Sequence, residues 1–66
     1  MIKPITTIWQ DSSDGPVFVT ELIGLPLPVP ELGDTVFIHG IGETVCTGFG
    51  NSGSNNDLVE VILTVK

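Results

Sequence analysis

The chain has 66 residues, of which 41% are hydrophobic and only 15% charged, and its eight acidic side chains against two lysines give a formal net charge of −6. One cysteine excludes an intrachain disulfide, and one cysteine with one histidine supplies too few soft ligands for a structural zinc. The shortage of cations argues against direct binding of nucleic acid and against attachment to an anionic membrane.

A chain of this length forms one small domain, which buries only about 60% of the surface that its unfolded form exposes. Further stabilisation is therefore expected, and subunit association is the remaining source once a disulfide and a zinc are excluded. The mean hydropathy of +0.42 agrees with this. We expect a homo-oligomer or a complex with another protein; the alternative is an unusually apolar monomer.

The composition predicts strands and no helix. Valine, isoleucine, threonine and phenylalanine dominate the apolar positions, glycine and proline interrupt the chain at short intervals, and no window keeps the helical period. The first strand is expected at residues 2–10, where Pro4 places it at a sheet edge or breaks it. The polar run DSSDG, residues 11–15, is then expected to turn into a second strand at residues 16–23.

The run LPLPVP, residues 25–30, has proline at every second position and cannot form a regular ladder. Its apolar spacers Leu25, Leu27 and Val29 favour a strap packed over the end of a barrel. The alternative is a docking ligand for a proline-binding groove.

Three further strands follow the proline run. A tight turn at residues 33–34 precedes a strand that ends near His39, and the GIG sequence of residues 40–42 closes a hairpin onto a strand at residues 43–49. The last strand, residues 58–65, is apolar on both faces at its middle. We therefore expect it to be central in the sheet or covered at an interface.

Five short strands with a proline-bounded crossover predict an all-β fold, either a small five-stranded barrel or a rolled antiparallel sheet. The run PELGDTVFIHG, followed by a hairpin, a polar loop and VEVILTV, resembles the second half of Src-homology-3-like small barrels. It also resembles short uncharacterised bacterial and phage β proteins with a P-x-x-G-D-x-V strand. The resemblance covers residues 28–65 and implies an interaction module. It does not extend to the groove that grips proline-rich peptides, because that groove needs several exposed aromatic residues and this chain has one tryptophan and no tyrosine.

The run GFGNSG, residues 48–53, matches the dinucleotide-binding fingerprint G-x-G-x-x-G. That fingerprint requires a helix after the glycines to hold the pyrophosphate, but the following residues are β-branched and predict a strand. We reject nucleotide binding. The glycines are expected to let a long hairpin loop turn, with Gly50 or Gly53 at positive φ.

Two polar loops contain candidate oxygen ligands for calcium. The loop of residues 50–57 supplies oxygens from Asn51, Asn55 and Asp57, and DSSDG supplies Asp11 and Asp14. Calcium prefers six to eight oxygens with two or more carboxylates, so loop chemistry is the favoured interpretation of both segments. A small-ligand or calcium-binding β domain that uses residues 50–57 is the alternative function.

Catalysis has one candidate pair, Cys46 as nucleophile and His39 as base, which fall on successive strands of one hairpin. A cysteine in this setting is more often a small apolar filler, and His39 is more often a solvated strand end. We therefore predict a protein that is not an enzyme and has no cofactor. The start MIKPITTIWQ lacks the apolar core of a signal peptide, so a cytoplasmic location is expected.

The sequence thus predicts a non-enzymatic protein-interaction or assembly module that self-associates. The first or the last strand is expected to offer the pairing edge. The candidate interface residues are large apolar side chains on the first, second and last strands and in the proline run: Trp9, Phe18, Leu25, Leu27, Val29 and Ile62.

Overall fold

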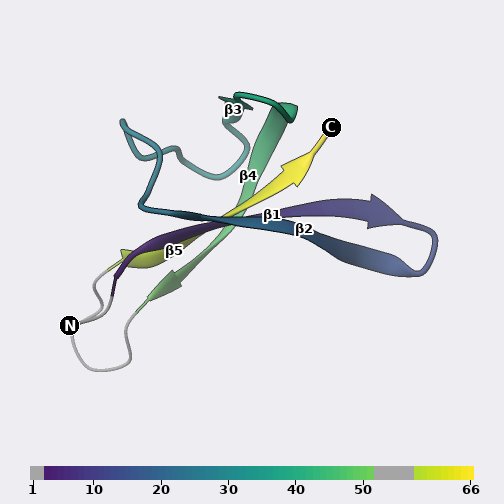
Figure 1. Cartoon of the computed structure of the whole chain (residues 1–66), viewed down its shortest axis with the longest axis horizontal. Coiled ribbons are helices and arrows are strands. Elements are labelled where there is room, and N and C mark those ends of the chain that lie inside the picture. Colours follow the sequence, from purple (N-terminus) through teal and green to yellow (C-terminus); the bar gives the residue numbers. More distant parts are fainter. Residues whose placement is uncertain (1–2, 52–57) are drawn as a thin grey trace.

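The computed structural model of the chain describes residues 3–51 and 58–66. Within these ranges the chain has no helix and five strands: β1 (Ile5–Ser12), β2 (Gly15–Ile23), β3 (Thr35–Ile38), β4 (Gly42–Asn51) and β5 (Leu58–Val65) (Figure 1). All five strands belong to one sheet with the order β2-β1-β5-β4-β3. The predicted all-β class and the positions of the five strands are confirmed.

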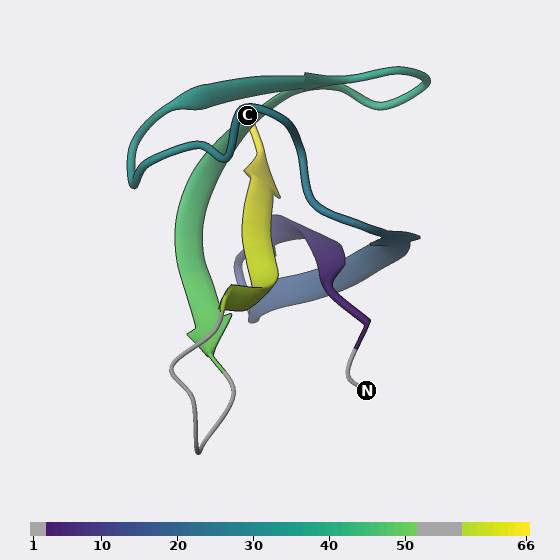
Figure 2. The same cartoon turned by 90° about the vertical axis from the view of Figure 1, so that its left-hand side faces the viewer.

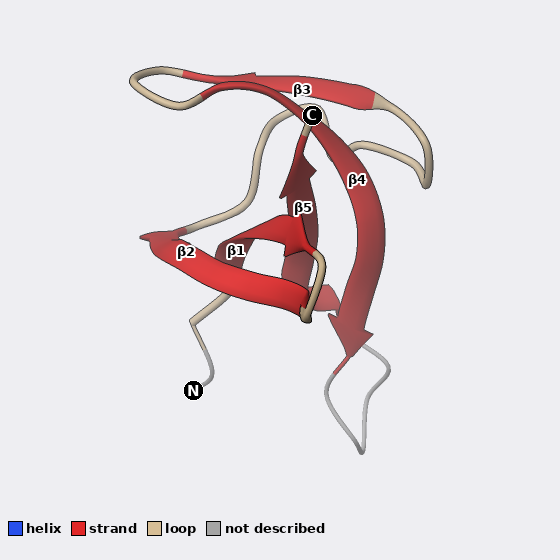
Figure 3. Cartoon of the chain, turned by 90° about the vertical axis from the view of Figure 1, so that its right-hand side faces the viewer, coloured by secondary structure: helices blue, strands red, loops and turns tan. Residues whose placement is uncertain are grey.

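The sheet is mixed and open. β1 pairs with β5 in parallel, whereas the three other pairs are antiparallel. The prediction of a purely antiparallel sheet is therefore wrong at this one pair. The cause is the connection of residues 24–34, which carries the chain from β2 to the far edge of the sheet before β3 begins (Figure 2). The sheet curves strongly but does not close, so a barrel is not confirmed (Figure 3).

β1 begins directly after Pro4, so the expected interruption at the proline is confirmed. β1 is nevertheless an inner strand, because β2 and β5 pair with its two sides, and the expectation of an edge is wrong. The Pro4 carbonyl accepts a hydrogen bond from the Gly24 amide at 2.8 Å. β5 lies between β1 and β4, as expected for a strand that is apolar on both faces.

The β1–β2 hairpin projects beyond the rest of the sheet (Figure 1). β1 pairs with β5 only as far as Gln10, and its last two residues pair with β2 alone. The turn lies within the predicted DSSDG run but is shorter, because Asp11 and Ser12 belong to β1 and Gly15 to β2. The Ser12 hydroxyl donates to the Gly15 carbonyl at 2.6 Å, and Gly15 has a φ of 107°. A left-handed φ of this size favours glycine at that position.

The core lies on one face of the sheet. The buried hydrophobic side chains Ile8, Cys46, Val61 and Leu63 come from β1, β4 and β5. They are surrounded by partly buried apolar residues, namely Leu25, Val36, Ile38, Ile41, Leu58 and Val65. Buried hydroxyls on this face are satisfied, since Thr44 donates to the Val36 carbonyl and Thr6 to the Gly24 carbonyl, each at 2.7 Å. We call this side of the sheet the core face.

The proline run is only partly a strap. Leu25 packs against the core and Pro30 is buried, as the strap interpretation requires. Leu27 is 87% exposed and Val29 is also exposed, so these two spacers do not pack on the core.

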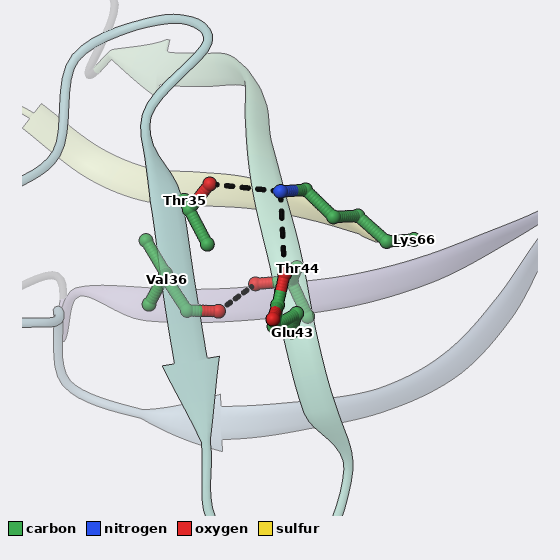
Figure 4. A network of polar contacts seen from close by, with 5 residues as sticks. All are labelled: Thr35, Val36, Glu43, Thr44 and Lys66. Carbon is green, nitrogen blue, oxygen red and sulfur yellow. Dashed lines mark hydrogen bonds and ion pairs between the residues drawn. The ribbon is translucent and has the colours of Figure 1, made fainter.

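The end of the chain joins β5 to the β3–β4 hairpin (Figure 4). The Lys66 ammonium donates to the Thr35 hydroxyl at 2.9 Å and forms an ion pair with Glu43 at 3.3 Å. The Lys66 amide also donates to the Glu43 carbonyl. These contacts link the end of β5, across β4, to the short edge strand β3.

Candidate interaction surface

β2 is a nine-residue edge strand with apolar side chains exposed on both faces. The exposed residues are Val17, Phe18, Val19, Leu22 and Ile23, and Ile23 is 84% exposed. Glu21 is the only charged residue of the strand, and no lysine interrupts it. Natural proteins usually protect such an edge with lysine, an internal proline or a very short strand. Of the features that protect an edge, β2 has Pro16 near its start and one bulge opposite Ile8 and Trp9.

The hydrogen bond from Gly24 to Pro4 fixes which backbone groups of β2 face the open edge. Residues of an antiparallel strand alternate between bonding to their partner and pointing away from it. Because Gly24 bonds to β1, Leu22 and Thr20 bond to β1 as well. Ile23 and Glu21 therefore direct their amide and carbonyl groups away from β1, toward the free edge.

The side of the sheet opposite the core has no second layer of described residues. The strand register places on it Ile5, Thr7, Trp9, Phe18, Glu21, Ile23, Thr35, Phe37, Glu43, Val45, Glu60, Ile62 and Thr64. Thr47 joins them through its contact with Thr64, and we call this side the open face. Its central side chains Trp9 and Ile62 are only half-buried, in contrast to Ile8 and Leu63 on the core face.

A groove of about 360 Å³ runs along the open face, lined by Trp9, Asp11, Pro16, Thr47, Ile62 and Thr64. The Trp9 ring meets the Phe18 ring edge to face, with centroids 5.3 Å apart and an interplanar angle of 77°. This geometry is favourable for an aromatic pair and fixes the indole as one wall of the groove. The Thr47 and Thr64 hydroxyls, 3.0 Å apart, also line the groove.

A chain of hydrogen bonds fixes one carboxylate on the open face. The Trp9 indole Nε1 donates to the Thr7 hydroxyl at 3.1 Å, and that hydroxyl donates to Glu60 Oε2 at 2.8 Å. Thr7 is buried and Glu60 is half-buried. Neither Thr7 nor Glu60 was predicted from the sequence as an interface residue. The available signal was a single charged residue in the otherwise apolar run LVEVILTV.

Gly48 and Gly50 of the GFGNSG run leave space for side chains of β5 on the open face. A Cβ at Gly50 would lie 3.0 Å from Glu60 Oε1, and a Cβ at Gly48 would lie 3.3 Å from Ile62 Cδ1. Both glycines belong to β4 and neither has a positive φ, so the positive φ expected at Gly50 or Gly53 is not at Gly50. At Gly50 glycine is needed because Glu60 on the neighbouring strand approaches the backbone closely, whereas at Gly48 the nearest atom is the movable end of the Ile62 side chain. Gly53 lies outside the described residues.

The six predicted interface residues fall into separate places. Trp9, Phe18 and Ile62 come together on the open face. Leu27 and Val29 line a different groove, between the proline run and β3. Leu25 packs on the core face and belongs to neither surface. The expected pairing edge is also wrong: β1 and β5 are paired on both sides, and the edges are β2 and β3.

The structure separates His39 from Cys46. Hydrogen bonds connect Cys46 with Asp34 and Gly33, whereas His39 follows Ile38 at the other end of β3. Asp34 and His39 are five residues apart, which spans about 17 Å in an extended strand. Cys46 is buried, and burial raises the pKa of its thiol; a backbone hydrogen bond at Gly48 lowers that pKa by less, and the nearby Asp34 charge, the smallest of the three effects, raises it. The proposed nucleophile–base dyad is therefore not formed.

The calcium hypothesis falls largely on residues that the structure does not describe. Asn55 and Asp57, with most of residues 50–57, lie outside the described ranges. Asp11 and Asp14 are exposed near the β1–β2 turn. Among the described residues, no group of three or more histidine, cysteine or acidic side chains could hold a metal ion.

Comparison of the chain with models of protein families, with curated proteins and with solved structures gave no match. In residues 3–51 and 58–66, no helix is long and apolar enough to cross a membrane.

Proposed function

We propose that the protein is a non-enzymatic interaction module that self-associates by pairing the free edge of β2 with the same edge of a second copy. The proposal rests on the exposed apolar edge that β2 presents. β2 is a nine-residue edge strand without lysine, and five of its apolar side chains are exposed. Main-chain hydrogen bonds between two such edges give affinity, and side chains on both faces of the paired strands add contact area.

The small core supports the same proposal. Among the described residues, four hydrophobic side chains are buried, whereas ten large hydrophobic side chains are exposed. A sheet that buries so few apolar groups within one subunit gains stability when a second subunit covers some of the others. The resemblance of residues 28–65 to Src-homology-3-like barrels, which mostly serve as interaction modules, agrees with this class of function.

Net charge sets the conditions for this association. Each copy carries a formal charge of −6, so two copies repel one another at low ionic strength. Salt screens this repulsion while leaving backbone pairing and apolar contacts in place. Self-association is therefore expected to strengthen as the salt concentration rises.

Sedimentation velocity over a wide range of protein concentration tests the proposal. The native chain is expected to form dimers, and Ile23→Pro is expected to stay monomeric, because proline removes an amide that faces the free edge. Ile23→Glu is a second variant that places a carboxylate in the pairing edge without changing the backbone; this side chain is 84% exposed, so the fold tolerates the change.

Phe37→Ser is the matched control. Phe37 is 72% exposed on β3, the other edge strand, and its substitution is expected to leave the dimer intact. Circular dichroism of each variant establishes that the sheet is retained. A native chain that sediments as a monomer at every concentration would end the proposal, as would folded Ile23→Pro and Ile23→Glu variants that associate like the native chain.

A further inference from the structure

The open face combines an apolar groove with a fixed carboxylate. Trp9 and Ile62 supply the apolar walls of the groove. Glu60 neighbours Ile62 along the same face of β5, and its Oε2 is held by the buried Thr7 hydroxyl. Gly50 lies opposite and leaves space for the other oxygen, Oε1. The carboxylate therefore has a defined position beside an apolar surface.

A second carboxylate faces the same region. Thr7 pairs with Glu21 across β1 and β2, so Glu60 and Glu21 flank Thr7 from opposite sides. Within the described residues, no cationic side chain forms an ion pair with either of them. The Lys66 ammonium lies on the same side of the sheet, but Thr35 and Glu43 hold it beyond the end of β5, six residues along the chain from Glu60. The face is thus negative and apolar at once, and its complement is positive and apolar.

We propose that the open face binds an extended cationic segment of another protein, in which an arginine or lysine pairs with Glu60 and the adjacent apolar side chains pack on Trp9 and Ile62. This binding goes beyond self-association, because it uses the open face over β1 and β5, whereas self-association uses the free backbone edge of β2. Nucleic acid does not fit the site, because its phosphates would meet Glu60 and Glu21. A cationic peptide side chain fits because it supplies both the charge and an apolar stem.

The chain provides its own reporter for this binding. Trp9 is the sole tryptophan, and there is no tyrosine, so intrinsic fluorescence reports on the groove wall directly. The probes are capped pentapeptides with arginine at the centre. The residues on either side of the arginine are leucine, isoleucine, valine or phenylalanine, and every pairing of these four is included. A matched set carries citrulline in place of arginine, which keeps the shape of the side chain and removes its charge.

At least one arginine peptide is expected to change Trp9 fluorescence saturably, and its citrulline counterpart is expected to bind about tenfold to a hundredfold more weakly. Glu60→Gln keeps an oxygen acceptor for Thr7. This variant is expected to bind the arginine peptide more weakly than the native chain by a similar factor. Glu31→Gln removes an exposed carboxylate on the crossover and is expected to leave the affinity unchanged.

Ionic strength separates this inference from the proposed self-association. Peptide binding is expected to weaken with salt, whereas dimerisation is expected to strengthen, and Ile23→Pro is expected to retain peptide binding as a monomer. If the native chain does not dimerise but still binds arginine peptides more tightly than citrulline peptides, the proposed self-association fails and this inference is supported. Absence of binding across the whole arginine set overturns it. So does equal affinity for arginine and citrulline peptides, or native affinity in a folded Glu60→Gln variant.

Discussion

The indole Nε1 of Trp9 lies 3.1 Å from the Thr7 hydroxyl oxygen and donates a hydrogen bond to it. The same hydroxyl donates to Glu60, so three polar groups from β1 and β5 satisfy one another on the open face. Thr7 is the central member of this chain and is buried. The parallel pairing of β1 with β5 brings the three residues together, although more than 50 positions separate Thr7 from Glu60 along the chain.

Removal of the Thr7 hydroxyl tests the importance of this chain. Thr7→Val keeps the shape of the side chain but leaves Trp9 Nε1 and Glu60 without their partner. We expect the free energy of unfolding to fall by about 1–3 kcal/mol. Urea unfolding followed by Trp9 fluorescence measures it. Thr47→Val is the control: its hydroxyl is exposed, so its loss is expected to change stability by less than about 0.5 kcal/mol. Equal stability of the Thr7 variant and the native chain would contradict the role assigned to Thr7.

The close approach of Glu60 to the β4 backbone predicts a difference between two glycines. In Gly50→Ala the new methyl group meets Glu60 Cβ at 3.1 Å as well as Oε1, and Cβ cannot move without the strand. We expect a loss of about 1–3 kcal/mol in the free energy of unfolding. In Gly48→Ala the nearest atom is the mobile end of Ile62, so a smaller loss or a gain of up to about 1 kcal/mol is expected. Thermal and urea unfolding of the two variants measure this difference. A larger loss of unfolding free energy in Gly48→Ala than in Gly50→Ala would contradict the prediction.

Cys46 predicts a dependence of stability on alkaline pH. Burial raises the pKa of its thiol above the ordinary value of 9.0, so the folded chain holds the proton more tightly than the unfolded chain. The corresponding stability is fully present below pH 9.0, the ordinary thiol pKa, and is lost as the pH rises through the higher folded pKa. We expect the free energy of unfolding to fall over that range in the native chain and to fall less steeply in Cys46→Ala. Urea unfolding at a series of alkaline pH values measures both slopes. Parallel slopes would contradict the prediction.

The ion pair at the end of the chain is expected to contribute little. Lys66 and Glu43 are largely exposed, so Lys66→Met should lower the free energy of unfolding by no more than about 1 kcal/mol. High salt should remove most of the difference between the variant and the native chain, because salt screens exposed charges. Urea unfolding at low and high ionic strength checks both statements. A loss of several kcal/mol that persists in high salt would show that the Thr35 hydrogen bond, and not the ion pair, holds β3 in place.

Residue types and spacing predicted the strands well. The β-branched runs bounded by glycine and proline located all five, and the continuous apolar run LVEVILTV predicted the central position of β5. The interruption at Pro4 also followed from local chemistry, because proline lacks the amide that a ladder needs. These features depend on residues that are adjacent in the sequence, so they can be predicted from it.

Strand order and the candidate site depend on contacts between distant residues, and these were missed. The parallel pairing of β1 with β5 is set by the path of residues 24–34 across the sheet, which composition does not reveal. Without that pairing, Thr7 and Glu60 could not be recognised as partners, and β2 could not be identified as an edge. The role of Gly50 was missed because the side chain that requires it, Glu60, belongs to another strand.

Amide hydrogen exchange in β2 tests edge pairing most directly. Ile23 and Glu21 direct their amides away from β1, so in a monomer they exchange with solvent, whereas the amides of Leu22 and Thr20 are protected by β1. Pairing with a second copy predicts that protection at Ile23 and Glu21 rises with protein concentration toward the level of Leu22 and Thr20. Unprotected amides at Ile23 and Glu21 at every concentration would contradict self-association through this edge.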